Sequence, residues 1–203
     1  MRLLELFSGT HSVGKVAKEL GYDVVSLDID GRADINCDIM EWDYTTYPVG
    51  HFDIVWGSFP CTTFSICRRS WINRKLKMFG DEVITKEILD KDMIDNGVPL
   101  LNKTIEIIDY FKPRLYFMEN PKTGYAKNFI DKPFYDVDYC MYNYPIKKPT
   151  RIWTNKKNFV PLKCNHTSKH MSWEEFSKGG NKLDKRHTIP PKLIYDLLGG
   201  TPP

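Results

Sequence analysis

Residues 2–28 read RLLELFSGTHSVGKVAKELGYDVVSLD, and this stretch decides the fold expected for the whole chain. The apolar run 2–7 predicts a strand, and the turn after it contains Gly9. Apolar residues at helical spacing then predict a helix over 13–20, and residues 24–27 predict a second strand. One β-turn-α-β unit of this kind is typical of an open α/β sheet.

The turn of this unit has the properties of a nucleoside-binding loop. Gly9 allows close approach of a ligand to a helix amino terminus, and Asp28 follows at a spacing suited to ribose hydroxyls. The turn has His11 and Ser12 where dinucleotide binders have more glycine, so S-adenosylmethionine fits better than NAD. Glycine turns with a downstream Asp also occur in α/β proteins that bind no nucleoside, and that alternative stays open.

A third element, residues 34–39, ends with two residues suited to an adenine ring. Asp38 could accept a hydrogen bond from the adenine amine while Ile39 packs on the base. The alternative is a surface turn with one apolar anchor.

The next strand, expected over 52–56, leads to a cysteine in a stiff turn. Pro60 restricts the backbone immediately before Cys61, which is how a nucleophile is presented, although a free cysteine is often a packing residue. A later strand, 114–118, ends at Glu119. Because functional residues of open α/β sheets gather at the carboxyl ends of strands, we expect these side chains to share one crevice with the glycine turn.

Residues 66–95 are rich in charged side chains, and basic residues surround Trp71. This composition predicts a mobile loop followed by a polar helix, either a lid over a nucleic-acid backbone or a solvated insertion. Residues 135–144 and 151–154 predict further strands, and a short helix follows Pro190-Pro191.

Composition limits the classes of protein to consider. A chain of 203 residues with 41% hydrophobic residues suits one domain, and five scattered cysteines favour a reducing compartment. We see no membrane span or secretory signal and expect a soluble intracellular protein.

Residues 1–60 have four Lys/Arg against ten Asp/Glu, whereas residues 147–203 have twelve against four. The basic half favours a nucleic-acid partner over a merely solvated surface.

Cys164, His166 and His170 have a loosely metal-like spacing. No fourth ligand is paired with them, and zinc sites usually show a second close pair. We therefore expect a basic surface loop here and no metal.

Together these motifs resemble those of the DNA (cytosine-5) methyltransferase family. The matching pieces are the cofactor loop Phe7-Ser8-Gly9, the ribose acid Asp28, the adenine contact Asp38-Ile39, the nucleophile motif Phe59-Pro60-Cys61 with Phe64-Ser65, the catalytic motif Glu119-Asn120-Pro121, and Arg151 before Ile-Trp-Thr as the last arginine of an Arg-x-Arg motif. The resemblance implies a Rossmann-like S-adenosylmethionine-dependent methyltransferase fold, an open and mostly parallel sheet with helices on both faces.

The resemblance also implies roles for individual residues. The catalytic set would be Cys61, Glu119 and Arg151. The S-adenosylmethionine set would be Phe7, Ser8, Gly9, Thr10, His11, Ser12, Asp28, Ile29, Asp38, Ile39, Phe59 and Pro60. The substrate set would be Ser65, Arg68, Arg69, Asn120 and Pro121. Cys61 would add to carbon 6 of a flipped or single-stranded cytosine in DNA, and Glu119 would bind the ring.

The sequence departs from the family pattern in three places. Pro121 stands where Val is usual, Pro149 replaces the first arginine, and only about 35 residues separate Arg151 from Arg186, too few for an independent recognition domain. The alternatives are therefore the same chemistry on RNA or a nucleotide, or a catalytically silent nucleic-acid-binding subunit. A homodimer or a partner subunit could supply target recognition. A restriction partner, an epigenetic mark and protection of a viral genome all remain open as roles.

We expect residues 1–155 to form the catalytic and cofactor-binding domain, with a mobile basic loop and helix at about 66–96. Residues 156–203 are expected to form a short basic extension whose final helix packs back on the domain.

Overall fold

The computed structural model describes residues 1–167, 169–176, 178 and 182–200. These residues contain a seven-stranded sheet in the order β3-β2-β1-β4-β5-β7-β6. The strands are β1 (Arg2–Leu6), β2 (Asp23–Asp28), β3 (Ile35–Asn36), β4 (Ile54–Gly57), β5 (Leu115–Pro121), β6 (Phe134–Asp138) and β7 (Pro149–Thr154). The first five are parallel, and β7 runs antiparallel between β5 and β6.

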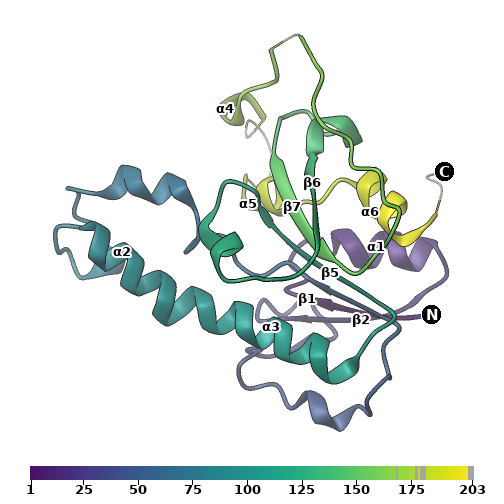
Figure 1. The fold of residues 1–203 in the computed structure, drawn as a ribbon. Helices are drawn as coiled ribbons and strands as arrows, with labels where there is room; N and C mark the ends of the chain where they lie inside the picture. The colour runs from purple at the N-terminus through teal and green to yellow at the C-terminus, as the bar shows by residue number, and fades with distance from the viewer. Residues whose placement is uncertain (168, 177, 179–181, 201–203) are drawn as a thin grey trace.

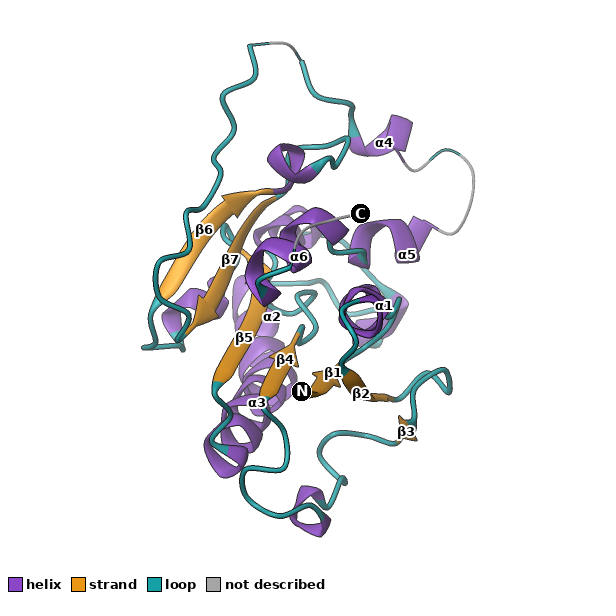
Figure 2. Ribbon diagram, turned by 90° about the vertical axis from the view of Figure 1, so that its right-hand side faces the viewer, coloured by secondary structure: helices purple, strands orange, loops and turns teal. Residues whose placement is uncertain are grey.

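Helices cover both faces of the sheet, as Figures 1 and 2 show. The α-helices are α1 (Ser12–Glu19), α2 (Lys86–Asp92), α3 (Val98–Phe111), α4 (Trp173–Phe176), α5 (Lys182–His187) and α6 (Pro191–Leu198). Helices α1 and α6 pack together on one face and α3 packs on the other. A π-helical turn, Met93–Gly97, joins α2 to α3, so the two form one long rod that extends beyond the sheet (Figure 1).

The central strand β1 shows why the opening stretch decides the fold. Leu3 packs with α1 and α6, whereas Leu4 and Leu6 pack with α3, and all three side chains are fully buried. Alternate residues of a strand point to opposite faces, so a strand covered by helices on both sides needs apolar residues at consecutive positions, and in β1 only Glu5 interrupts the buried apolar run. The expected α/β class, with its mostly parallel sheet and helices on both faces, is confirmed.

Two strand predictions differ from the structure. The strand expected over 135–144 ends at Asp138, and a 3₁₀ turn, Tyr139–Tyr142, follows. Tyr139 and Tyr142 are both buried in the same core cluster, and a 3₁₀ turn places residues three apart on one side, whereas a strand would separate them. Strand β5 extends to Pro121, so Glu119 lies within a paired strand and not in a loop.

The segment after Cys61 folds into two 3₁₀ turns, Ile66–Trp71 and Lys77–Phe79, before α2 begins. Arg68 is buried and forms an ion pair with Asp92 of α2, which ties the first turn to the helical rod. The mobility expected of this segment stays a prediction. No helix in the described ranges is both long and apolar enough to cross a membrane.

Candidate active site

A cleft of about 1250 Å³ runs along the carboxyl ends of β1, β2, β4 and β5. Most residues expected at the site line it, namely Phe7, Ser8, Gly9, Thr10, Ser12, Asp28, Ile29, Asp38, Ile39, Phe59, Pro60, Cys61, Ser65, Arg68, Glu119, Asn120 and Pro121. Residues from four different strand ends therefore meet in one place, as the crevice rule for open α/β sheets predicts.

The glycine turn and Asp28 form one end of the cleft. The backbone N–H of Gly9 donates to Asp28 Oδ2 over 2.8 Å, and Gly9 has a φ of +42°, a conformation that favours glycine. Ser8 Oγ is buried and lacks a hydrogen-bond partner among the described residues, so it is available to a polar ligand. Ile29 lines the cleft yet is 70% exposed, which leaves an apolar surface for a ring to cover. These residues fit a nucleoside cofactor.

Glu5 also lines this end of the cleft, although it is not among the residues expected there. Its carboxylate accepts hydrogen bonds from the backbone N–H groups of Val13 and Gly14 in the first turn of α1, at 3.2 and 3.0 Å. Burial raises the Glu5 pKa to about 7, although these hydrogen bonds and nearby lysines oppose the rise. The feature of the sequence that could have identified Glu5 is its position as an acidic residue inside an otherwise apolar strand.

The nucleophile turn is held by the neighbouring strand. The side-chain amide of Asn120 in β5 donates to the backbone oxygen of Phe59 over 3.0 Å, and Asn120 is almost fully buried. Phe59 and Phe64 pack edge to face in the core below the turn. Cys61 therefore sits on a turn that is fixed from both sides.

Glu119 lines the cleft together with Cys61 and has two polar partners. Tyr139 donates to Glu119 Oε1 over 2.9 Å, and Lys148 Nζ lies 3.9 Å from the same oxygen. Burial raises the pKa of the Cys61 thiol, and the Glu119 charge raises it further, while the Lys148 charge opposes both. The arrangement keeps Cys61 mainly a thiol at neutral pH, with one lysine favouring the thiolate.

The structure does not bring Arg151 to the cleft. The guanidinium forms hydrogen bonds with both carboxylate oxygens of Asp136 at 2.7 and 3.1 Å and stacks on Phe134. Arg151 pairs with Asn120 across β5 and β7, so these two side chains share one face of the sheet. The side chain of Glu119, the neighbour of Asn120 in β5, points to the other face. Arg151 therefore lies outside the cleft, its expected part in the reaction stays a prediction, and Lys148 is the cation beside Glu119.

Of three further residues expected at the site, two lie outside the cleft, and the third lines the cleft with its guanidinium already bound by other residues. His11 and Arg69 do not line the cleft: His11 is the residue before α1, and Arg69 lies over the Tyr125 ring. Arg68 does line it, but its guanidinium is engaged by Asp92 and by the Thr63 carbonyl oxygen.

The carboxyl-terminal part of the chain supplies the far wall of the cleft. The lining residues of this part, none of which was expected at the site, are Lys147, Lys148, Pro149, Trp173, Asp184, Arg186, His187 and Ile189. Partial burial and the Lys148 charge lower the pKa of His187. The basic excess after residue 147 was a signal for this wall, whereas nothing in the sequence indicated the contact between Tyr139 and Glu119.

Comparison with known proteins agrees with this architecture. No family model matches the chain. A solved structure from an E. coli prophage, provisionally named a DNA modification methyltransferase, superimposes with a TM-score of 0.50 and 14% identity. The match covers 89% of this chain, which spans only 55% of that protein. At this identity the likeness shows the fold alone.

A much closer relative comes from Frog virus 3 (isolate Goorha), where it is named "Probable DNA (cytosine-5)-methyltransferase". It is 38% identical over 219 aligned positions, covering 98% of this chain and 99% of the viral protein. The chain therefore belongs to the DNA (cytosine-5)-methyltransferase family, and the resemblance seen in its motifs is confirmed.

Proposed function

We propose that this protein transfers a methyl group from S-adenosylmethionine to carbon 5 of cytosine in DNA through a covalent Cys61 adduct. The observation that carries the proposal is the meeting of Cys61 and Glu119 in a cleft whose other end has the Gly9–Asp28 turn. Family membership and the viral relative's name support the reaction and its substrate.

The cofactor would bind at the end of the cleft formed by the glycine turn. Asp28 would accept hydrogen bonds from the ribose hydroxyls, Ile29 and Ile39 would contact the adenine, and Ser8 Oγ would gain the partner it lacks. When bound, S-adenosylmethionine supplies an electrophilic methyl group.

The reaction itself uses groups of the chain at the other end. The Cys61 thiolate would add to carbon 6 of cytosine, which makes carbon 5 nucleophilic enough to take the methyl group. Glu119, held by Tyr139, would hydrogen-bond the cytosine ring and stabilise the electron-rich adduct. Transfer of the carbon 5 proton to water would then restore the double bond and expel Cys61 as thiolate.

The basic wall of the cleft supports a nucleic-acid substrate. Lys147, Lys148 and Arg186 border the cleft and could contact phosphates largely without regard to sequence. Because carbon 6 is hidden within a duplex stack, the target cytosine would have to be flipped or single-stranded. We further propose that the protein acts inside cells, where DNA lies and its five free cysteines stay reduced.

A methyl-transfer assay tests this function. The protein is incubated with methyl-labelled cofactor and, separately, duplex DNA, single-stranded DNA, tRNA or cytidine nucleotides. We expect label at carbon 5 of DNA cytosine, no transfer by Cys61→Ala, and a loss of at least about 100-fold for Glu119→Gln. Glu41→Gln, an exposed carboxylate outside the cleft, is the matched control. Labelling of RNA alone, or equal activity of Cys61→Ala, would refute the proposal.

Target recognition needs a separate measurement because the segment between β7 and α6 is short. A second copy of the chain or a partner subunit could complete the recognition surface. Light scattering of the protein with and without duplex DNA tests the first case: a dimer on DNA supports it, and a monomer with full activity excludes it.

A further inference from the structure

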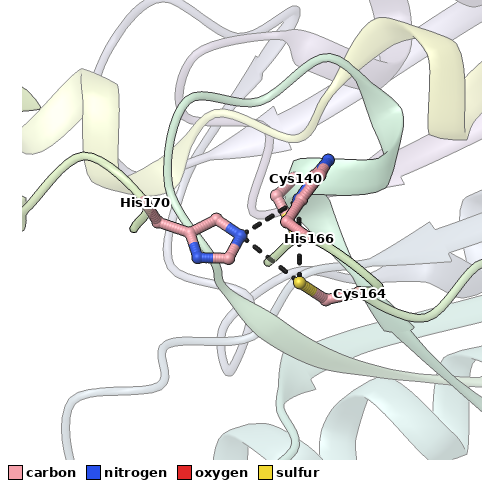
Figure 3. A group of neighbouring side chains, drawn as sticks. All are labelled: Cys140, Cys164, His166 and His170. Carbon is pink, nitrogen blue, oxygen red and sulfur yellow. Dashed lines mark hydrogen bonds between the residues drawn. The ribbon is translucent and has the colours of Figure 1, made fainter. Parts of the chain in front are cut away.

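Four sulfur- and nitrogen-bearing side chains face one another at the far end of β6, outside the active-site cleft (Figure 3). They are Cys140, Cys164, His166 and His170, and their ligand atoms all lie within 4.8 Å of one another. The sequence shows no fourth ligand for the last three, and the structure brings Cys140 beside them from a distant part of the chain.

Hydrogen bonds hold together the two segments that carry Cys140 and Cys164. Cys140 belongs to the 3₁₀ turn after β6, and Cys164 belongs to the segment after β7. The N–H of Cys164 donates to Asp138 Oδ2 over 2.8 Å, and the N–H of Asp138 donates to the Leu162 oxygen over 3.1 Å. The hydroxyl oxygen of Tyr142 accepts from the N–H of Leu162 over 2.9 Å. The segment that contains Cys164 is therefore bonded to residues at both ends of the 3₁₀ turn that contains Cys140.

The distances match the edges of a metal tetrahedron. Zinc bonds of about 2.3 Å to sulfur and 2.0–2.1 Å to nitrogen give ligand–ligand edges of roughly 3.3–3.8 Å. The observed separations are 3.7 Å from Cys164 Sγ to His166 Nδ1, 3.3 Å from Cys164 Sγ to His170 Nε2, and 3.1 Å between the two ring nitrogens. Shifts of about 1 Å or less at Cys140 would complete the set.

We propose that these four residues bind one Zn²⁺ ion as a structural Cys₂His₂ site. Two thiolates and two imidazoles form a donor set that selects zinc over magnesium or calcium, and with all four positions taken the metal keeps no open position for chemistry. Binding releases the two thiol protons, and each histidine contributes a neutral ring nitrogen, so the filled site has no net charge. The site is separate from Cys61 and does not depend on the methyl-transfer reaction.

The position of the site indicates a structural role for the metal. His170 lies three residues before Trp173, which lines the active-site cleft, and the Arg186 guanidinium lies 5.9 Å from the Trp173 ring. Zinc would tie this stretch to the end of β6 and so hold the far wall of the cleft in place. A protein without zinc should therefore lose DNA affinity more than cofactor affinity.

Metal analysis of the purified protein tests the site directly. The chain is expressed in zinc-supplemented medium, purified without chelators and measured by elemental mass spectrometry, with an expected content of about one Zn²⁺ per chain. Cys164→Ser and His170→Asn should both lower the zinc content at least tenfold, whereas the matched controls Cys67→Ser and His51→Asn, which lie outside the cluster, should not.

A second measurement covers the case in which a variant fails to fold. Unsubstituted protein stripped of metal is titrated with Co²⁺, and the site should give a thiolate-to-cobalt charge-transfer band and the visible bands of tetrahedral cobalt at one equivalent. Absence of both zinc and these bands, or a Cys140–Cys164 disulfide in the freshly purified chain, would overturn the proposal. Zinc content does not depend on catalysis, so this result and the methyl-transfer assay can fail independently.

Discussion

The side-chain amide of Asn120 donates a hydrogen bond to the backbone oxygen of Phe59, two residues before Cys61. This buried bond of 3.0 Å joins β5 to the nucleophile turn and sets the position of Cys61 relative to Glu119. Replacing Asn120 by Ala would leave a buried carbonyl unpaired, at a cost of about 1–3 kcal/mol. We expect kcat to fall roughly 10- to 100-fold with little change in cofactor affinity. Asn128→Ala, an exposed asparagine, is the control, and unchanged kcat in Asn120→Ala would contradict this role.

Lys148 should control how readily Cys61 ionises. Burial and the Glu119 charge raise the Cys61 pKa and the Lys148 charge lowers it, so Lys148→Met should move the pKa further upward. The measurement is the rate of Cys61 alkylation by iodoacetamide against pH, followed by mass spectrometry. Lys127→Met, an exposed lysine, should leave the profile unchanged. A downward or absent shift in Lys148→Met would show that the lysine does not act on the thiol.

Glu5 should make stability depend on pH. Its pKa rises from the ordinary 4.5 to about 7 on folding, so its contribution is fully present below pH 4.5 and is lost as the pH rises through 7. Relative to wild type, Glu5→Gln should therefore gain stability over this window, by at most about 3 kcal/mol. Urea unfolding of both proteins from pH 4.5 to 8 measures the difference. A difference that stays constant across the window would mean that Glu5 is ionised in the folded protein throughout.

Arg151 should matter for stability more than for chemistry. Burial of Asp136 acts to raise its pKa, but the hydrogen bonds and charge of Arg151, together with Lys122, hold that pKa below its usual range. Arg151→Met should lower the free energy of unfolding by about 1–3 kcal/mol, because Asp136 loses its bidentate partner. Thermal unfolding and kcat are measured on the same preparation. A large loss of kcat with unchanged stability would instead restore Arg151 to the reaction.

The expected residues that the structure gathers in the cleft share one property: they lie at or just beyond the ends of strands whose order in the sheet can be inferred. Cys61 and Glu119 come at strand ends, and a parallel sheet brings such ends together whatever its details. Arg151 could not be placed in the same way, because its partner depends on the register that sets Asp136 opposite it in β6. Cys140 was missed for a related reason, since only the packing of the segment after β7 onto the turn after β6 brings it to Cys164.

Trapping of a covalent adduct tests the central claim, that Cys61 attacks the cytosine ring. A duplex oligonucleotide containing 5-fluorocytosine is incubated with the protein and S-adenosylmethionine, because fluorine at carbon 5 blocks the release of Cys61. We predict a stable protein–DNA complex whose mass includes one methyl group, with the crosslink mapped to Cys61 by peptide fragmentation and absent in Cys61→Ser. Tight DNA binding without any adduct, or a crosslink that persists in Cys61→Ser, would contradict the mechanism.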